Sequence, residues 1–214
     1  MPRAPKAPRP TRVLFVRHGQ TPTTGKVLPG RAKGLHLADA GRAQADAVAA
    51  RIAGLKGVAA VYASPLERTR ETAAPIARAL GLRVVADRGL LECDFGDWTG
   101  AELKALAKRP EWRTVQRYPS GFRFPGGESM QEMQARICDA TARLCAAHPG
   151  ETIVCVSHAD PIKAVVAAAV GTHLDLFQRI VVSPCSVSAI GYGADGPVVL
   201  SVNSTGDLAG LVPS

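Results

Sequence analysis

Two histidines in this chain each follow a short apolar run, which is where an α/β protein is expected to place catalytic side chains. Arg17 and His18 come directly after residues 13–16, and His158 comes directly after residues 153–157. Parallel strands present functional side chains at their carboxyl ends, where crevices form in open sheets. We therefore predict one site assembled from both halves of the chain.

The residue types near these positions could carry out phosphoryl transfer. An imidazole nitrogen is a competent nucleophile at neutral pH, and the planar fork of arginine suits phosphoryl oxygens. A carboxylic acid with a raised pKa can protonate the leaving alkoxide. Each residue alone has an ordinary structural interpretation, so the prediction depends on their joint occurrence. The set that could act together without a metal is Arg17, His18, Arg68, Glu92 and His158.

The segments around these residues resemble, in the same order, those of the histidine phosphatase superfamily, the phosphoglycerate mutase-like proteins. Arg-His-Gly alone would be a weak signal, but several co-linear matches from about residue 12 to about 190 are specific. The matching stretches are residues 14–21, 63–73, 91–100, 125–129 and 156–159.

The resemblance implies a role for each residue. His18 would be the nucleophile that becomes phosphohistidine, and Arg17, Arg68 and His158 would hold the phosphoryl oxygens. Glu92 would protonate the leaving group and then activate water. The implied enzyme is a metal-independent phosphoric monoester hydrolase of the histidine acid phosphatase type, with no cofactor and a small phosphorylated metabolite as substrate.

Two positions depart from the family pattern. Thr24 stands where the family often has an asparagine that contacts phosphate, and its hydroxyl could still donate a hydrogen bond. Asp160 lies in Ala159-Asp160-Pro161, where glycine is common. Asp160 either caps the following helix, with Pro161 in the first turn, or adds negative charge near the phosphate and tunes a histidine.

Two other functions use the same site. The segment 98–128 is short for a cofactor-dependent phosphoglycerate mutase, which favours a phosphatase, but it carries Arg113, Arg117 and Arg123. These arginines either point into the pocket and select an acidic substrate or lie in solvent. A non-catalytic protein that binds a phosphorylated ligand is the third alternative, and the presence of both His18 and Glu92 argues against it.

Periodicity and turn residues predict the elements that position the site. The expected fold is a three-layer α/β sandwich with a mostly parallel mixed sheet, helices on both faces and a small helical insert at 98–128 over the site. Strands are expected at 12–16, 58–63, 82–86 and 152–157, followed by a hairpin of 186–192 and 198–203. Helices are expected at 37–55, 64–80, 129–148 and 160–170, with one or two short helices in 101–118.

The length and bulk composition predict a single domain over residues 12–214, and the resemblance implies that it is the catalytic domain. The chain has 214 residues, of which 46% are hydrophobic, and no apolar stretch approaches the roughly 18–20 residues of a membrane span. Its five cysteines form no Cys-x-x-Cys pair, which is typical of reduced, buried thiols in a cytoplasmic protein.

Residues 1–11 are predicted to be a disordered, basic, proline-rich arm. The net charge is +8, and half of it comes from four cations in the first 12 residues. Such an arm could contact nucleic acid or anionic lipid, but no aromatic residues interleave its charges. We therefore expect a solvated tail and neither a nucleic-acid nor a membrane partner. The edge of the C-terminal hairpin offers a surface for a homodimer.

Overall fold

One six-stranded sheet organises residues 9–206, the part of the chain that this computed structural model describes. The strand order is β3-β2-β4-β1-β5-β6. The first four strands in the chain run parallel, and β5 is antiparallel to both β1 and β6. The predicted mixed sheet and C-terminal hairpin are therefore confirmed. The strands are β1 (Thr11–Arg17), β2 (Val58–Ala63), β3 (Val84–Ala86), β4 (Thr152–Ser157), β5 (Val187–Gly193) and β6 (Gly196–Ser204).

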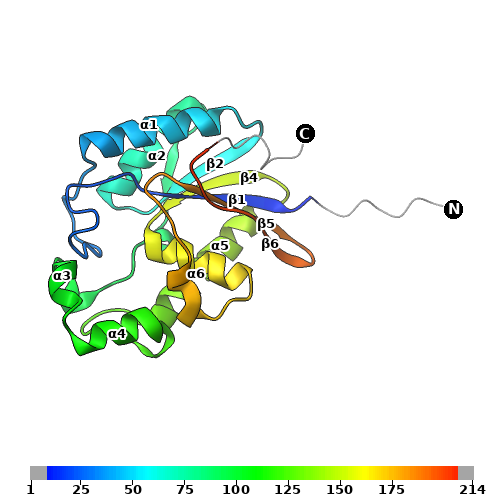
Figure 1. Cartoon of the computed structure of the whole chain (residues 1–214). Helices are drawn as coiled ribbons and strands as arrows, with labels where there is room; N and C mark the ends of the chain where they lie inside the picture. The colour runs from blue at the N-terminus through cyan, green and yellow to red at the C-terminus, as the bar shows by residue number, and fades with distance from the viewer. Residues whose placement is uncertain (1–8, 207–214) are drawn as a thin grey trace.

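Helices cover both faces of this sheet, as predicted (Figure 1). The helices α1 (Asp39–Ala53) and α2 (Glu67–Ala79) pack on one face, and α5 (Met130–Ala147) and α6 (Ala159–Ala169) pack on the other. Side chains of β1 alternate between two cores because successive strand residues point to opposite faces. Val13 and Phe15 belong to the core beneath α5 and α6, whereas Leu14 and Val16 belong to the core beneath α1 and α2.

The insert is built on the same core as the sheet. It contains the short helices η2 (Gly96–Trp98), α3 (Leu103–Leu106), α4 (Pro110–Arg117) and η3 (Pro119–Gly121). Trp98 is 5.4 Å from both Phe122 and Phe124, measured between ring centroids, and Trp98 and Phe124 are buried in the core that lies beneath α5 and α6. Shared aromatic packing therefore fixes the insert against the domain. The remaining short helices are η1 (Arg88–Leu90) and η4 (Leu174–Arg179).

Several predicted boundaries were wrong. β1 begins at Thr11, inside the predicted arm, and pairs with Tyr192; residues 1–8 of that arm lie outside the described residues. The second helix begins at Glu67, not residue 64, because the Ser64 N–H donates to the carbonyl of Val156 and continues the sheet ladder. The N-cap of α6 is His158, so Asp160 is not the cap.

All five cysteines are free, but the predicted burial is only partly right. Cys93, Cys155 and Cys185 are buried, whereas Cys138 and Cys145 on α5 are half-buried. Within residues 9–206, no helix combines the length and apolar character needed to cross a membrane.

Two glycines allow the loop after β1 to lie directly on the start of α1. A Cβ built on Gly19 would be 2.5 Å from the carbonyl oxygen of Gly41, and a Cβ on Gly41 would be 2.0 Å from that of Gln20. Real Cβ atoms do not approach backbone oxygens so closely. The path of the chain just after His18 therefore depends on the absence of these two side chains.

Gly41→Ala is expected to lower the free energy of unfolding by about 2 kcal/mol, because an overpacked contact with rigid backbone forces a local shift. Urea denaturation followed by circular dichroism measures the change. Gly54→Ala is the matched control, since Gly54 has helical φ and ψ angles and its Cβ would meet only the Arg51 carbonyl, at 3.5 Å. We expect that control to leave stability unchanged or to raise it by up to about 1 kcal/mol. Equal stability of the two variants would contradict the close-approach argument.

Candidate active site

The carboxyl ends of three neighbouring parallel strands bring the predicted residues together. β1 and β4 pair with Arg17 opposite Ser157, so His18 and His158 follow at the same edge. Their ring centroids lie 5.2 Å apart. β2 lies on the other side of β4, and the loop after it leads into Arg68 in the first turn of α2. The predicted assembly from both halves of the chain is thus present.

His18 is held as a neutral imidazole with a defined tautomer. Its Nδ1 lies 2.7 Å from the carbonyl oxygen of Gly19, and because a carbonyl only accepts, Nδ1 must carry the proton. Burial, together with the charge of Arg68, lowers the pKa of His18 to about 3. The lone pair of Nε2 is therefore available at any pH above about 3.

A hydrogen bond to α2 fixes the loop that carries His18. The Gly19 N–H donates to Thr72 Oγ1 at 3.0 Å, and that hydroxyl donates to the carbonyl of Arg68. One hydroxyl thus links the backbone of the His18 loop to the turn that carries Arg68.

Arg17, Arg68 and His158 present buried polar atoms without partners among the described residues. Arg17 Nη1 donates to the Val182 carbonyl and Arg68 Nη2 to the Gly30 carbonyl, each at 2.7 Å. Arg17 Nε, Arg68 Nε and Nη1, and His158 Nδ1 remain unpaired. Unpaired buried donors are costly, and their convergence beside His18 fits an anion with several acceptor oxygens.

His158 is also neutral. Burial first, and then the charge of Arg68, lowers its pKa well below the ordinary value. Its Nε2 lies 2.9 Å from Ser64 Oγ. When the Ser64 hydroxyl donates to Nε2, the ring proton is on the unpaired Nδ1, which is then a neutral donor.

Glu92 is a buried carboxyl that can carry a proton near neutral pH. Its residue is 7% exposed, and its Oε1 accepts a 3.0 Å hydrogen bond from the Cys93 N–H. Burial, reinforced by the negative charge of Asp160, raises the pKa of Glu92 to about 7. It is therefore poised between the acid and base forms at physiological pH.

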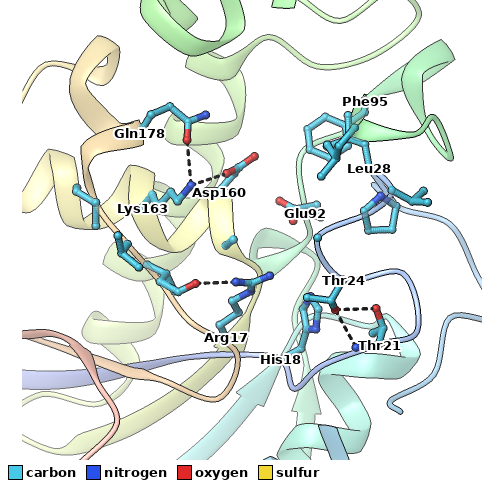
Figure 2. A pocket seen from close by; sticks show the side chains of 18 of the residues that line it. Arg17, His18, Thr21, Thr24, Leu28, Glu92, Phe95, Asp160, Lys163 and Gln178 are labelled. Carbon is cyan, nitrogen blue, oxygen red and sulfur yellow. Dashed lines mark hydrogen bonds and ion pairs between the residues drawn. The ribbon is translucent and has the colours of Figure 1, made fainter. Parts of the chain in front are cut away.

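A cavity of about 430 Å³ opens over these groups. Its lining includes Arg17, His18, Thr24 and Glu92. Arg68 and His158 are fully buried and are not part of the lining. Figure 2 shows Asp160, Lys163 and Gln178 on one side of Glu92 and the apolar side chains of Leu28 and Phe95 on the other. Trp112 and Gln116 contribute to the lining from α4 of the insert.

Thr24 lies in this cavity, but its hydroxyl is already engaged. Its Oγ1 accepts from the Thr21 N–H at 2.8 Å and lies 3.0 Å from Thr21 Oγ1. The hydroxyl can still donate its one proton, so its role as a phosphate ligand stays a prediction.

The insert arginines do not reach the cavity. Arg113, Arg117 and Arg123 are all exposed, and none of them lines it. Arg123 forms an ion pair with Glu132 on α5 instead. Of the two interpretations offered by the sequence, the structure shows solvent-exposed cations.

Asp160 lies in the cavity lining, in the first turn of α6. Its Oδ1 forms a 3.5 Å ion pair with Lys163 Nζ. The charge of Asp160 acts on Glu92, whose pKa it raises, and on Arg17. The expectation of added negative charge at the site is therefore met at the carboxyl, rather than at a histidine.

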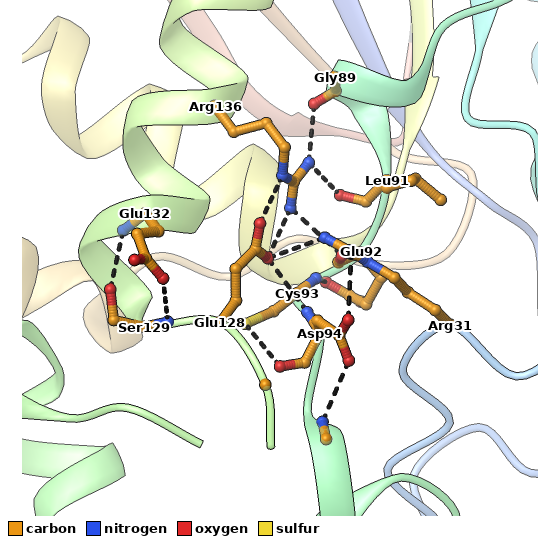
Figure 3. Close-up of polar contacts among 12 residues, drawn as sticks. Arg31, Gly89, Leu91, Glu92, Cys93, Asp94, Glu128, Ser129, Glu132 and Arg136 are labelled. Carbon is orange, nitrogen blue, oxygen red and sulfur yellow. Dashed lines mark hydrogen bonds and ion pairs between the residues drawn. The ribbon is translucent and has the colours of Figure 1, made fainter. Parts of the chain in front are cut away.

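A network of two arginines and one glutamate fixes the backbone of Glu92 (Figure 3). The carbonyl of Glu92 accepts from Arg31 Nε at 2.9 Å and from Arg136 Nη2 at 3.2 Å. Glu128 joins these arginines: Oε1 accepts from Arg136 Nε at 2.7 Å, and Oε2 accepts from Arg31 Nη2 at 2.9 Å. The position of Glu92 is thus set through its main chain, which leaves its carboxyl free to exchange a proton.

The sequence analysis missed several residues of this site. Glu128 lies in the matching stretch 125–129, which by itself predicts no role for it, and Arg31 and Arg136 carry no local signal. Lys163 could have been found, because a spacing of three residues from Asp160 places both on one helix face. Within residues 9–206, no three His, Cys, Asp or Glu side chains converge in a way that could hold a metal ion.

Comparison with known proteins shows which family the chain resembles. The family model for the histidine phosphatase superfamily (branch 1) matches residues 13–205. A bifunctional protein of Mycobacterium tuberculosis is 36% identical over 207 residues, which cover 93% of this chain and 55% of that protein. The chain thus spans about half the length of that relative.

Two further proteins match over nearly their whole length. Phosphoserine phosphatase 1 of Hydrogenobacter thermophilus is 30% identical over 199 residues, covering 91% of this chain and 92% of that protein. The solved structure of a mycobacterial glucosyl-3-phosphoglycerate phosphatase superposes with a TM-score of 0.81 at 25% identity, covering 94% of this chain and 100% of the other.

Glu128→Gln is expected to lower the free energy of unfolding by about 2 kcal/mol or more, because it leaves the partly buried guanidinium of Arg136 without a carboxylate partner and that of Arg31 with Asp94 alone. The loss is smaller than for a fully buried pair because the side chains are 15 to 27% exposed. Urea denaturation measures the loss. Glu132→Gln is the control, since its pair with Arg123 is more than half exposed and glutamine retains the capping role. A similar loss in both variants would count against a special role of the Glu128 network.

Proposed function

The chain belongs to the histidine phosphatase superfamily, and from this premise we propose that it hydrolyses a small phosphomonoester through a phosphohistidine at His18. The observation that carries the proposal is that an unprotonated ring nitrogen and a protonated carboxyl lie at the same edge of the sheet. His18 is neutral, with its Nε2 lone pair free, and Glu92 holds its proton up to a pKa of about 7. A nucleophile and a general acid are thus both ready in the same pH range.

The first step transfers the phosphoryl group to the enzyme. Nε2 of His18 attacks phosphorus and forms an N–P bond while the ester P–O bond breaks. Glu92 gives its proton to the departing alcohol oxygen. The unpaired donors of Arg17 and Arg68 bind the equatorial oxygens, where charge develops.

The second step returns the enzyme to its starting state. The Glu92 carboxylate takes a proton from a water molecule, whose oxygen attacks phosphorus as the N–P bond breaks. Phosphate leaves, His18 is again neutral, and Glu92 is again protonated. Neutral His158 and the Thr24 hydroxyl contribute donors without adding positive charge.

Features of the insert support hydrolysis over the mutase alternative. A mutase has to retain an acidic substrate and donate the phosphoryl group back to it. The arginines of the insert that could hold such a substrate are exposed and lie outside the cavity. The retention of His18 and Glu92 in a buried, connected site supports catalysis over simple binding of a phosphorylated ligand.

His18→Ala is expected to lower kcat/KM for 4-nitrophenyl phosphate by at least about a thousandfold, because it removes the attacking nitrogen. Absorbance at 400 nm gives the rate, and acid-labile labelling by a phosphorylated substrate reports the intermediate. His36→Ala is the control, since His36 is 61% exposed and lies outside the cavity. Retained labelling in His18→Ala would overturn the proposed nucleophile.

Glu92→Gln is expected to slow an alkyl phosphate by about 10²–10⁴-fold and 4-nitrophenyl phosphate far less, because nitrophenolate leaves without a proton. In the wild type, kcat/KM for the alkyl phosphate should fall as the pH rises through about 7, where Glu92 loses its proton. That decline should be absent from the variant. Parallel pH-rate profiles for the two substrates provide the measurement, and equal slowing of both would argue against Glu92 as the acid.

A further inference from the structure

We infer that Asp160, Lys163 and Gln178 form a subsite that recognises the leaving group, and that it selects an alcohol with no net charge that offers a hydrogen-bond donor beside an acceptor. Polyhydroxy alcohols and zwitterionic alcohols share this chemistry. The inference rests on the proposed phosphatase function and adds the class of substrate.

The three side chains form one connected wall of the cavity. Asp160 and Lys163 are one turn apart on α6, and Gln178 comes from η4. Lys163 Nζ donates to Gln178 Oε1 at 3.0 Å and lies 3.5 Å from Asp160 Oδ1. The side chains of Lys163 and Asp160 are only 17% and 18% exposed, so Lys163 is held in place rather than free in solvent (Figure 2).

This wall offers a ligand both a hydrogen-bond donor and a hydrogen-bond acceptor. An ammonium group has three donors, and Lys163 uses one of them in its hydrogen bond to Gln178, while Asp160 lies at ion-pair distance. Asp160 Oδ2 has no hydrogen-bond partner among the described residues. A ligand can therefore accept a bond from Lys163 and donate one to Asp160 at neighbouring positions.

The charges of the cavity decide which ligand suits this pair. Lys163 and Arg17 are the cations that line it among the described residues, and Arg17 lies beside His18, where the phosphoryl group is attacked. The Asp160–Lys163 pair has no net charge. An anionic leaving group is attracted by Lys163 but repelled by Asp160, and a cationic leaving group is attracted by Asp160 but repelled by Lys163. A leaving group that is neutral overall can satisfy both without either repulsion.

The opposite wall of the cavity is apolar. Leu28 and Phe95 lie on this side (Figure 2), and Trp112 adds a further apolar side chain to the cavity lining. The substrate is thus expected to have one polar edge, which faces α6, and one edge that makes apolar contact.

The experiment compares four phosphomonoesters with similarly poor alcohol leaving groups. Glycerol 3-phosphate releases a neutral polyol and O-phospho-L-serine a zwitterion, whereas 3-phosphoglycerate releases an anion and phosphoethanolamine a cation. For glycerol 3-phosphate, O-phospho-L-serine or both, we expect the wild type to show a kcat/KM at least about tenfold higher than for 3-phosphoglycerate and phosphoethanolamine. Which of glycerol 3-phosphate and O-phospho-L-serine is preferred distinguishes a polyol from a zwitterionic substrate.

Two variants test the subsite in opposite directions. Asp160→Asn makes it net positive, so the ratio of kcat/KM for 3-phosphoglycerate to that for phosphoethanolamine should rise by about tenfold. Lys163→Gln makes it net negative, and the same ratio should fall by about tenfold. Because the ratio compares two alkyl phosphates in one variant, a general change in the acidity of Glu92 cancels.

Asp39→Asn is the matched control, because Asp39 also lies in the first turn of a helix and pairs with the cation three residues later, Arg42, but on the surface. The ratio should not change in that variant. Ratios that move by less than about twofold in both cavity variants, or a wild type that prefers a singly charged leaving group, would overturn the inference. Hydrolysis of 4-nitrophenyl phosphate separates the two failures, since its absence in the wild type overturns the proposed function itself.

Discussion

The structure depends most on the burial of His18, Arg68 and His158 beside the half-buried Arg17 at one edge of the sheet. Burial disfavours the charged forms of both histidines and lowers the pKa of each, and the charge of fully buried Arg68 lowers it further. The two imidazoles are therefore neutral, whereas a histidine in water would be half protonated near pH 6.5. Burying arginine donors without partners also costs free energy, and in the proposed mechanism the phosphoryl oxygens supply the missing acceptors.

Glu92 requires a different kind of support, because the role of general acid that we propose for it needs a carboxyl that is free to lose its proton. A carboxyl fixed by an arginine would be held ionised, as is the case for Glu128: burial raises its pKa, but Arg136, the Asp94 N–H and Arg31 together lower it below the ordinary value. In Glu92 the two arginines bind the carbonyl oxygen instead. The chain thus uses Glu128 to anchor the arginines and the arginines to anchor the backbone, while the Glu92 carboxyl meets only the Cys93 N–H.

The sequence predicted the parts of this molecule that depend on local pattern. Apolar runs gave the strands and the sheet edge, and helical spacing and glycines gave the helices to within a few residues. The start of α2 was misjudged because a sheet hydrogen bond from Ser64 to Val156 overrides the local preference of Ser-Pro to open a helix. The network of Arg31, Glu128 and Arg136 joins residues up to about a hundred positions apart. No local pattern encodes such contacts, because they follow from how the insert and α5 pack around the loop that carries Glu92.

Asp160 shows why the charge of a whole cavity has to be considered, and not that of single residues. An aspartate beside a phosphoryl-transfer site should weaken the binding of an anionic substrate, and its position after His158 makes it a departure from the family pattern. Lys163 offsets that charge from the same helix face, and Gln178 holds the lysine in place. The carboxylate can then raise the pKa of Glu92, while the wall as a whole adds no net charge. In the proposed mechanism the same residue thus has two roles: it raises the pKa of the Glu92 carboxyl and offers its free oxygen to the leaving group.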